Sequence, residues 1–510
     1  MEEAMGPGHT GTPPSPTESP SHSVASGPHH PSPGPPMSRR AETILWHDYE
    51  TTGVDPRVDR PLSFAACRTD LDLNEVEDPV EVHFRLAEDC IPSPDACLIT
   101  GLDPDRAGTM AEVDGARRVL AALGEPRTCG AGYNSIRFDD EVTRFLLWRN
   151  LLPVYERESR NGSSRFDLLP VLRAACALRP DGMEWPVGEE GWPVFRLDVL
   201  APANGIHHQA HDALADVRAT IAVAQKLLTA QPDLFGYLSE ARFRDTVRDR
   251  LRSFGSDPFV HTSGRFPAAV RSTSVVAHLA DHPRYRGQLL CLDLRHDPQV
   301  LLDHDVDQLR MLLFTPRDQR PEGAPRVGIK GIHPGRCPVI APLAVLDAAS
   351  QERIALEPST WERHMALLDA HRDEIARKAQ AIYDEGGTAA HDVDQALYDG
   401  FVEDDDAALC REVHAAADNP TSWRSLEREF RDDRLGELLF RLRARNHPES
   451  LGMTEHTRWM ELRRQKALEP GRAALARCQE LRESGADAAI LDACEAAIRR
   501  RIEPLEAMQG

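Results

Sequence analysis

The chain has 510 residues, of which 41% are hydrophobic and 28% charged, a composition typical of a soluble globular protein with about three domains. No apolar run approaches the roughly 18 residues of a membrane span, and the start, Met1-Glu2-Glu3, lacks the apolar segment of a secretion signal, so we expect a cytoplasmic protein without membrane contact. The net charge of −22 argues against a protein that coats nucleic acid or anionic membranes, and restricts any nucleic-acid partner to a confined groove.

Residues 1–36 contain 10 Pro, 6 Ser and 5 Gly and almost no apolar residues. Such a segment buries too little surface to offset its ordering entropy, so we predict a disordered tail over 1–40. Met37 lies just before the first predicted strand, and we hypothesise that it is the true start of translation. The ten cysteines include no Cys-x-x-Cys pair, which favours reduced, mostly buried thiols over disulfides or a zinc cage.

An α/β domain is predicted over 41–231. Short apolar runs at 44–46 and 64–66 predict two neighbouring strands, and apolar residues spaced three or four apart predict helices over 142–149 and 213–228. Strands mixed with helices in this way are typical of an α/β sheet.

Two further domains follow. Residues 232–385 predict a small β-rich domain with some helix around 361–375. Its short strand-like runs lie at 274–276, 288–292 and 327–329. Residues 386–510 are rich in Ala, Leu, Glu and Arg with few turn signals, which predicts a helical domain.

The first candidate site residues are Asp48 and Glu50, at the end of the first strand. Side chains two apart on a strand share a face, so these carboxylates point the same way. Adjacent carboxylates repel unless a cation lies between them, and hard oxygen ligands suit Mg²⁺ or Mn²⁺. Without such a cation, they are two unrelated acids at a solvated strand end.

The second candidate is Asp139, in the segment Gly132–Asp139 (GYNSIRFD). It precedes a helical pattern that starts near Glu141, so its structural interpretation is a helix N-cap. Asp140 and Glu141 are interpreted as solvated first-turn acids that complement the helix dipole.

The third candidate segment is His211–Asp216, which leads into the last helix of the α/β domain. Asp212 is the predicted N-cap, Asp216 lies one turn into the helix, and His211 lies on the loop before it. His207 and His211 have the spacing of a zinc pair, but His208 stands where such a motif carries glutamate, which disfavours zinc.

The order Asp-x-Glu, Asn-x-x-x-Phe-Asp, His-x-x-x-x-Asp within about 170 residues resembles the DEDDh branch of the DEDD exonuclease superfamily. Longer stretches between about 42 and 466 resemble the bacterial exonuclease I family. They are HDYET (47–51), LITGL (98–102), GYNSIRFDDEVTR (132–144), ALRP (177–180), FRL (195–197), ANGI (203–206) and LRARN (442–446).

The resemblance implies a fold and an activity. It implies a ribonuclease-H-like exonuclease domain over 41–231, an SH3-like domain over 232–385 and a C-terminal helical domain over 386–510, which together enclose a single strand. It also implies a monomeric enzyme of DNA repair that degrades single-stranded DNA processively from the 3′ end to 5′-mononucleotides.

The resemblance also implies a two-metal mechanism. Two Mg²⁺ ions, with Mn²⁺ as an alternative, offset the repulsion of four carboxylates and clamp the attacking and leaving oxygens. Asp48, Glu50 and Asp216 are expected to hold one ion, and Asp48 and Asp139 the other. His211 is expected to act as the general base.

Contacts to DNA are implied for further residues. Glu50, Thr51 and Thr52 are expected at the terminal nucleotide, and Ile99 and Leu102 as a wedge against the last base unless they are core residues. The expected phosphate contacts are Arg196, Arg144 and Arg173, unless these form surface salt bridges, and the stacking surfaces are Tyr155 and Phe166. In the helical domain, the basic residues expected to follow phosphates are Arg441, Arg443, Arg445, Arg463 and Arg464, with Trp459, unless they form the charged outer face of a bundle.

Relatives in this family also bind the acidic C-terminal tail of single-stranded-DNA-binding protein. Such a tail needs a basic group beside an apolar pocket, for which Arg179 and Tyr237 are the candidates. Two alternatives stay open. One is another DEDDh nuclease, for proofreading or RNA, although those are usually single domains. The other is a non-catalytic scaffold that binds single strands.

Overall fold

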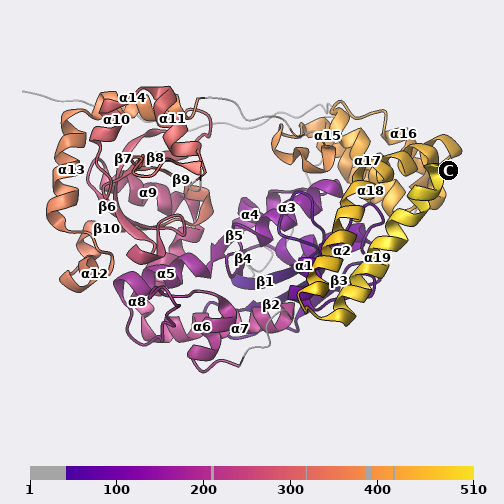
Figure 1. The fold of residues 1–510 in the computed structure, drawn as a ribbon, viewed down its shortest axis with the longest axis horizontal. Coiled ribbons are helices and arrows are strands. Elements are labelled where there is room, and N and C mark those ends of the chain that lie inside the picture. Colours follow the sequence, from indigo (N-terminus) through magenta and orange to yellow (C-terminus); the bar gives the residue numbers. More distant parts are fainter. Residues whose placement is uncertain are drawn as a thin grey trace, which may run out of the picture. The chain divides into compact units, whose positions relative to one another are not determined.

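The computed structural model describes residues 42–207, 212–316, 319–384, 390, 392–416 and 420–509. The predicted tail over 1–40, with Met37, and the predicted general base His211 lie outside these residues. The described chain forms an α/β domain up to Ser239, a β-rich domain up to Asp384 and a helical domain from Asp392 onward, coloured in this order from indigo to yellow in Figure 1.

The sheet of the α/β domain has the strand order β3-β2-β1-β4-β5. Its strands are β1 (Thr43–Thr51), β2 (Pro61–Thr69), β3 (Val80–His83), β4 (Thr128–Gly132) and β5 (Ser164–Asp167). β1 pairs antiparallel with β2 and parallel with β4. The two predicted strands are therefore confirmed as the inner parts of β1 and β2.

Helices cover both faces of this sheet. The helices of this domain are α1 (Pro94–Thr100), α2 (Glu112–Leu123), α3 (Asp139–Arg149), α4 (Glu156–Ser159), α5 (Leu168–Leu178), α6 (Leu197–Ala203), α7 (Ala213–Ala230) and α8 (Pro232–Ser239). Along β1, Ile44 and Trp46 pack against α5 and α7, whereas Leu45 and Tyr49 pack against α2 and α3. This alternation places even-numbered residues of β1 on the α7 face.

The β-rich domain is built on a second five-stranded sheet with the order β10-β6-β7-β8-β9. Its strands are β6 (Phe259–Thr262), β7 (Thr273–Asp281), β8 (Leu289–Asp293), β9 (Ile329–Ile332) and β10 (Val339–Pro342), and its helices are α9 (Arg244–Phe254), α10 (Gln299–Asp303), α11 (Val306–Phe314), α12 (Ala348–Arg353), α13 (Pro358–Ala370) and α14 (Arg372–Ile382).

The helical structure predicted around 361–375 is confirmed, and it consists of two helices separated by a turn at His371. His371 leaves the helical conformation with φ −130° and ψ 22°, so α13 ends before it and α14 begins after it. The break lets Leu368 on α13 and Ile375 on α14 both reach the same core. Apolar spacing alone continues across such a turn and does not show it.

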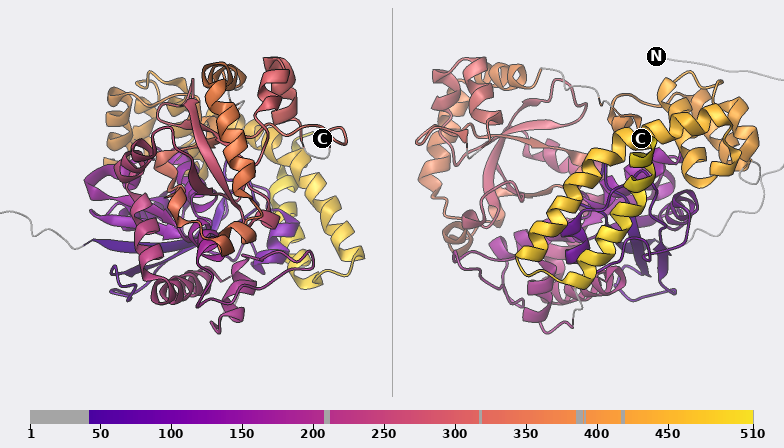
Figure 2. Two further views of the ribbon diagram at one scale, coloured as in Figure 1. Left: turned by 90° about the vertical axis from the view of Figure 1, so that its left-hand side faces the viewer. Right: turned by 45° about the vertical axis from the view of Figure 1, so that its right-hand side comes forward.

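The helical domain lies against the α/β domain. Its helices are α15 (Asp404–Ala415), α16 (Trp423–Leu426), α17 (Asp433–Asn446), α18 (Met453–Glu483) and α19 (Ala488–Glu506), preceded by the short 3₁₀ helix η7 (Val393–Tyr398). Figure 2 shows the long helices α18 and α19 side by side. A Cβ atom at Gly471 of α18 would collide with Ile502 of α19, so glycine permits their close approach.

Two further expectations concern the chain as a whole. All ten cysteines carry free thiols and nine of them are buried, as predicted. Among the described residues, no helix combines the length and the apolar character needed to cross a bilayer. The predicted order of an α/β domain, a β-rich domain and a helical domain is confirmed.

Candidate active site

Three carboxylates converge where β1 ends. Asp48, Glu50 and Asp216 each offer an oxygen atom, and these atoms lie within 4.8 Å of one another. Asp48 and Glu50 continue the even-numbered face of β1, which confirms that they point the same way. Within the described ranges, this is the one group of three or more His, Cys, Asp or Glu side chains that is close enough to share a metal ion.

The start of α7 places Asp216. Asp212 adopts extended backbone angles and its side chain accepts a hydrogen bond from the Ala215 N–H at 2.8 Å, so the predicted N-cap is confirmed. α7 packs against β1 and β2, and Asp216 lies in its first turn. The cap thus fixes the helix end that brings this carboxylate to β1.

Asp139 is the first residue of α3, and its predicted N-cap role is wrong. Phe138 occupies the cap position, and no side chain caps the helix. The Asp139 carboxylate is 3% exposed, and its Oδ1 has no hydrogen-bond partner. A buried carboxylate oxygen without a partner is costly, and a cation would satisfy it.

The helix that carries Asp139 is tied to β1. The Thr143 hydroxyl lies 2.9 Å from the hydroxyl of Tyr49 and donates to the Asp139 carbonyl at 2.8 Å. Tyr49 belongs to the odd-numbered face of β1, opposite Asp48 and Glu50. β1 thereby places two carboxylates on one face, and through Tyr49 on its opposite face it anchors α3, the helix that carries Asp139.

The acids that follow Asp139 are not solvated, contrary to the sequence prediction. Asp140 is buried and accepts hydrogen bonds from Arg157 at 2.8 Å and Arg165 at 2.9 Å. Burial alone would raise the pKa of Asp140, but these guanidinium groups outweigh burial and lower it. Glu141 is bound by Arg144 and Tyr398. The first turn of α3 lies beneath α4 and β5, so its acids need partners there.

The carboxylates at the end of β1 repel one another. Burial raises the pKa of Asp48 well above its ordinary value, and the charges of Asp139, Glu50 and Asp216 raise it further. Burial and the charges of Asp216 and Asp212 raise the pKa of Glu50 to about 7. Burial also raises the pKa of Asp139. Divalent cations would remove this repulsion, and carboxylates are the ligands that Mg²⁺ and Mn²⁺ prefer.

A cavity of about 890 Å³ opens beside Asp216, lined by residues of both the α/β and the β-rich domain. Four predicted residues line it, namely Ile99, Arg173, Arg196 and Asp216. Ile99 is 56% exposed, and the Arg196 guanidinium is exposed and bound to Asp198. The arrangement therefore collects an apolar side chain, two arginines and a carboxylate in one place.

Several residues of this cavity were missed from the sequence. They include Tyr133, Asn134, Phe195, Asp198, Gly264 and Phe266. Asn134 has φ 63°, a left-handed conformation that asparagine tolerates, and its N–H donates to the buried Asp167 at 2.9 Å. Its position inside the GYNSIRFD segment was the available signal. Nothing in the sequence indicates that Gly264 and Phe266 of the β-rich domain join this cavity.

Four predicted substrate contacts do not fit the geometry. Thr52 is 0% exposed, and its hydroxyl donates to Asp59 and accepts from the Arg60 N–H. Phe166 is buried in the core, so it offers no stacking surface. The Arg144 guanidinium is held by Glu141, Glu158 and the Tyr398 hydroxyl, which leaves it no room for a phosphate. Thr51 is also buried, and its hydroxyl donates to the Gly53 carbonyl.

The other predicted contacts lie outside the cavity lining. Leu102 packs on the cluster of Leu62, Leu86 and Cys90. Tyr155 is partly exposed, with the Arg144 guanidinium 5.5 Å from its ring centre. Arg179 donates to the Val345 carbonyl at 3.2 Å, and Tyr237 lies under the Arg250 guanidinium. The roles of Leu102, Tyr155, Arg179 and Tyr237 stay predictions.

The basic residues of the helical domain do not form a phosphate track. Four of the arginines are buried in ion pairs with acids, namely Arg441, Arg443, Arg445 and Arg463. The Trp459 side chain is buried as well, in a small apolar core. Arg464 is bound to Glu461. The prediction is wrong for Arg441, Arg443, Arg445 and Arg463, because their side chains point into the protein, whereas the role of the partly exposed Arg464 stays a prediction.

Comparisons with known proteins give a consistent result. Three family models match the chain, described as exonuclease (residues 45–224), exonuclease I SH3-like domain (242–385) and exonuclease I C-terminal domain (391–494). Exodeoxyribonuclease I of Escherichia coli (strain K12) is 40% identical over 432 residues, which cover 84% of this chain and 90% of that protein.

Solved structures are similar over almost the whole chain. The crystal structure of E. coli exonuclease I in complex with a dA16 oligonucleotide has 38% sequence identity and a TM-score of 0.86, and the match covers 91% of this chain and all of that one (100%). A structure of SSB/exonuclease I in complex with the inhibitor CFAM has 37% identity and a TM-score of 0.84, with coverage of 91% and 100%.

Proposed function

The chain belongs to the exonuclease I family, and from this premise we propose that it hydrolyses single-stranded DNA from the 3′ end and releases 5′-mononucleotides. The observation that carries the proposal is the convergence of Asp48, Glu50 and Asp216 beside a cavity wide enough for a nucleotide. The presence of both non-catalytic domains favours this activity over that of a single-domain nuclease.

We propose that two Mg²⁺ ions, or Mn²⁺, bind at the carboxylates. Asp48, Glu50 and Asp216 would hold one ion, and Asp48 with Asp139 the other, since the buried Oδ1 of Asp139 needs a partner. When bound, such ions stabilise the charge on the attacking and leaving oxygens. His211, outside the described residues, would take the proton from the attacking water, which a neutral imidazole near pH 7 suits.

The cavity supplies the proposed substrate contacts. Ile99 would pack against the terminal base, and Arg173 and Arg196 would bind backbone phosphates. Positive charge crowds at this place although the chain as a whole is acidic. Burial and the charge of Arg265 lower the pKa of Arg137, and burial and the charge of Arg137 lower that of Arg173. A bound phosphate backbone would relieve this repulsion, as expected of a confined groove.

A protein partner is also proposed. A relative has been solved as SSB/exonuclease I, and we propose that this chain binds the acidic tail of its own single-stranded-DNA-binding protein at Arg179 and Tyr237. Arg179 is partly exposed, and Tyr237 packs between the cores of the α/β and the β-rich domain. We expect a cytoplasmic monomer that acts in DNA repair.

A labelled strand tests the activity. We expect single-stranded DNA with a 5′ label to shorten stepwise from its other end in Mg²⁺, whereas a 3′ label is released at once as a mononucleotide. Chelator or the Asp48→Asn variant should stop both reactions, and single-stranded RNA should be degraded far more slowly. Label release from the 5′ end first, or unchanged cleavage in chelator, would contradict the proposal.

A further inference from the structure

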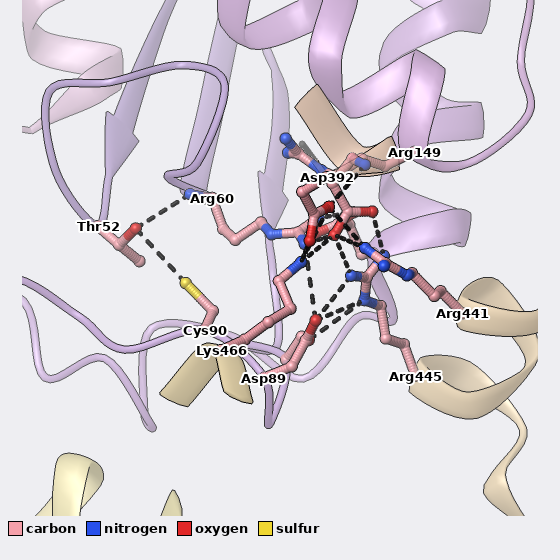
Figure 3. Close-up of polar contacts among 12 residues, drawn as sticks. Thr52, Arg60, Asp89, Cys90, Arg149, Asp392, Arg441, Arg445 and Lys466 are labelled. Carbon is pink, nitrogen blue, oxygen red and sulfur yellow. Dashed lines mark hydrogen bonds and ion pairs between the residues drawn. The ribbon is translucent and has the colours of Figure 1, made fainter. Parts of the chain in front are cut away.

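A buried network of ion pairs joins the helical domain to the α/β domain close to the active site (Figure 3). The α/β domain contributes Arg60, Asp89, Glu112 and Arg149, and the helical domain contributes Asp392, Asp394, Arg441, Arg445 and Lys466. Two of these residues, Arg441 and Arg445, were predicted from the sequence to contact DNA. Their burial rules that role out, and the proposed reaction gives the network no other.

Arg445 on α17 is the centre of the network. Its guanidinium binds Asp89 of the α/β domain at 2.7 Å and Asp394 of the helical domain at 2.6 Å. All three side chains are buried. The planar guanidinium of arginine has N–H donors in fixed directions and can bind two carboxylates at once. A lysine ammonium at the same position is a compact charge and cannot reproduce this geometry.

The network continues from Asp89 and Asp394 to Arg60, at the start of β2. The Arg60 guanidinium lies 3.5 Å from Asp394 and 4.0 Å from Asp89, and it donates to Glu112 at 3.1 Å. Figure 3 shows Arg60 and Arg445 reaching the same group of carboxylates from different parts of the chain. Arg60 is therefore held by acids of both domains.

The backbone of Arg60 leads directly to the active site. Its N–H donates to the Thr52 hydroxyl at 3.0 Å, and its carbonyl accepts from the Thr52 N–H at 2.9 Å. Thr52 follows the metal-ligand candidate Glu50 by two residues. The Thr52 carbonyl in turn accepts from Ser93, the N-cap of α1, and α1 carries Ile99. Both the end of β1 and the helix of the proposed wedge thus rest on this loop.

The charged side chains at the interface between the two domains are connected by many shared ion pairs. Each of the four carboxylates lies within 4.0 Å of at least two cationic side chains. Buried ion pairs contribute little net stability, because desolvation offsets their attraction, and their best-supported use is to fix one register between packed elements. The two domains are held together by apolar packing instead. Leu438 and Leu442 of α17 share a core with Phe145 and Leu146 of α3.

We propose that Arg445 is a positioning residue for the active site. Through Asp89, Asp394 and Arg60 it fixes the loop 51–60, and with it the place of Glu50 relative to the substrate end. The helical domain is then required for the rate of hydrolysis. The kinetic consequence rests on the proposed nuclease function, whereas the effect on the loop does not.

The chain offers a matched control on the same helix. Arg443 is 0% exposed and, like Arg445, binds two acids, Glu427 and Glu455, with a further hydrogen bond to the Ser450 carbonyl. All of these partners belong to the helical domain. Arg445→Lys and Arg443→Lys therefore make the same chemical change at similarly buried guanidinium groups, and only the first affects contacts with the α/β domain.

Two measurements test the proposal on the two variants. Hydrogen exchange of the 51–60 amides should become about tenfold faster in Arg445→Lys and stay as in the wild type in Arg443→Lys. The single-turnover rate per folded molecule at saturating single-stranded DNA should fall by about tenfold only in Arg445→Lys, with the dissociation constant for a long strand changed by less than about threefold, because misplacement of a catalytic group slows the reaction without removing distant phosphate contacts.

Equal exchange of the 51–60 amides in the two variants would overturn the proposal, as would equal single-turnover rates. If Arg445→Lys does not fold, Asp89→Asn replaces it, since it removes one charge without changing the shape of the side chain, and the same pattern is expected. If the wild type itself shows no metal-dependent cleavage, the proposed function fails, and the exchange measurement alone decides on the role of Arg445.

Discussion

Glu50 and Asp216 offer carboxylate oxygens within 4.8 Å of each other, although one ends a β-strand and the other lies one turn into a helix. Burial and the charge of Asp216 together raise the pKa of Glu50 to about 7. The fold therefore keeps acids together that destabilise it when no cation is bound. Such conflict with stability is expected at functional sites.

Removal of one of these charges should stabilise the metal-free protein. In chelator, Asp216→Asn should raise the free energy of unfolding by about 1 kcal/mol, because it relieves repulsion among buried carboxylates. Mg²⁺ should stabilise the wild type, since it binds the folded state, and should stabilise the variant less, because one of the two proposed ions has lost a ligand. Urea unfolding with and without Mg²⁺ measures both effects, with the exposed Asp245→Asn on α9 as control. Equal stabilisation of Asp216→Asn and the wild type by Mg²⁺ would exclude Asp216 as a ligand.

His211→Ala tests the proposed general base. The variant should bind metal and DNA as the wild type does but lose about 10²–10⁴-fold in single-turnover cleavage, the typical contribution of a general base. Unchanged cleavage would remove His211 from the mechanism. A loss of metal binding would instead make it a ligand.

Ile99 and Leu102 form a matched pair, because both were predicted to wedge against the last base. Ile99 is exposed in the cavity, so Ile99→Ala should leave the melting temperature almost unchanged and raise KM or lower kcat on short strands. Leu102 packs on a small core, so Leu102→Ala should lower stability by about 1–3 kcal/mol. An Ile99→Ala enzyme with wild-type kinetics would show that this side chain does not touch the substrate.

Because His261 is buried, we predict that the β-rich domain loses stability at acid pH. Burial, helped by the charge of Lys330, lowers the pKa of His261 to about 3, and its Nδ1 lies 2.8 Å from the Val339 carbonyl. The unfolded chain takes up this proton near pH 6.5, so the stability that His261 contributes is complete above that pH. It is lost as the pH falls toward 3, by up to about 1.4 kcal/mol per pH unit.

The His261→Asn variant checks this contribution, because its amide can still donate to the Val339 carbonyl. Its free energy of unfolding, measured by urea between pH 7 and 5, should fall less steeply than that of the wild type. Identical slopes would show that His261 titrates alike in the folded and unfolded chain.

The proposed partner site predicts a loss of peptide binding. An acidic tail peptide of single-stranded-DNA-binding protein should bind Arg179→Ala about tenfold more weakly than the wild type, because one charge-assisted contact is lost. The measurement is fluorescence anisotropy at low salt, with cleavage of free single-stranded DNA as the control for folding. Unchanged peptide affinity would reject Arg179 as a contact.

The sequence was sufficient for the strand that carries the site. The apolar run of β1 fixes its alternation, and alternation places Asp48 and Glu50 on one face without knowledge of the rest of the fold. The Asp212 cap was likewise local, since an N-cap interacts with the next turn of its own helix. Convergence of Asp139 and Asp216 on this strand came from the resemblance to a family, because spacing along a chain does not determine distances in space.

The role of charged residues was harder to predict. Asp140 looked like a solvated acid, but its partners Arg157 and Arg165 lie 17 and 25 residues away. Arg445 looked like a phosphate contact, but its partner Asp89 lies 356 residues away. A charged residue on a helix has the same local pattern whether it faces solvent, DNA or a buried acid of another domain. Burial decides between these, and it depends on how the domains pack.

The most direct test of the central claim is a count of bound Mn²⁺ by calorimetric titration, in the presence of a single strand with a non-hydrolysable 3′-terminal linkage. We predict two ions per wild-type chain, of which one is weakened or lost in Asp139→Asn. Neither ion should bind tightly to Asp48→Asn, because Asp48 is the proposed ligand of both. Wild-type protein that binds no Mn²⁺, or an Asp48→Asn variant that binds two ions as tightly as the wild type, would contradict the account.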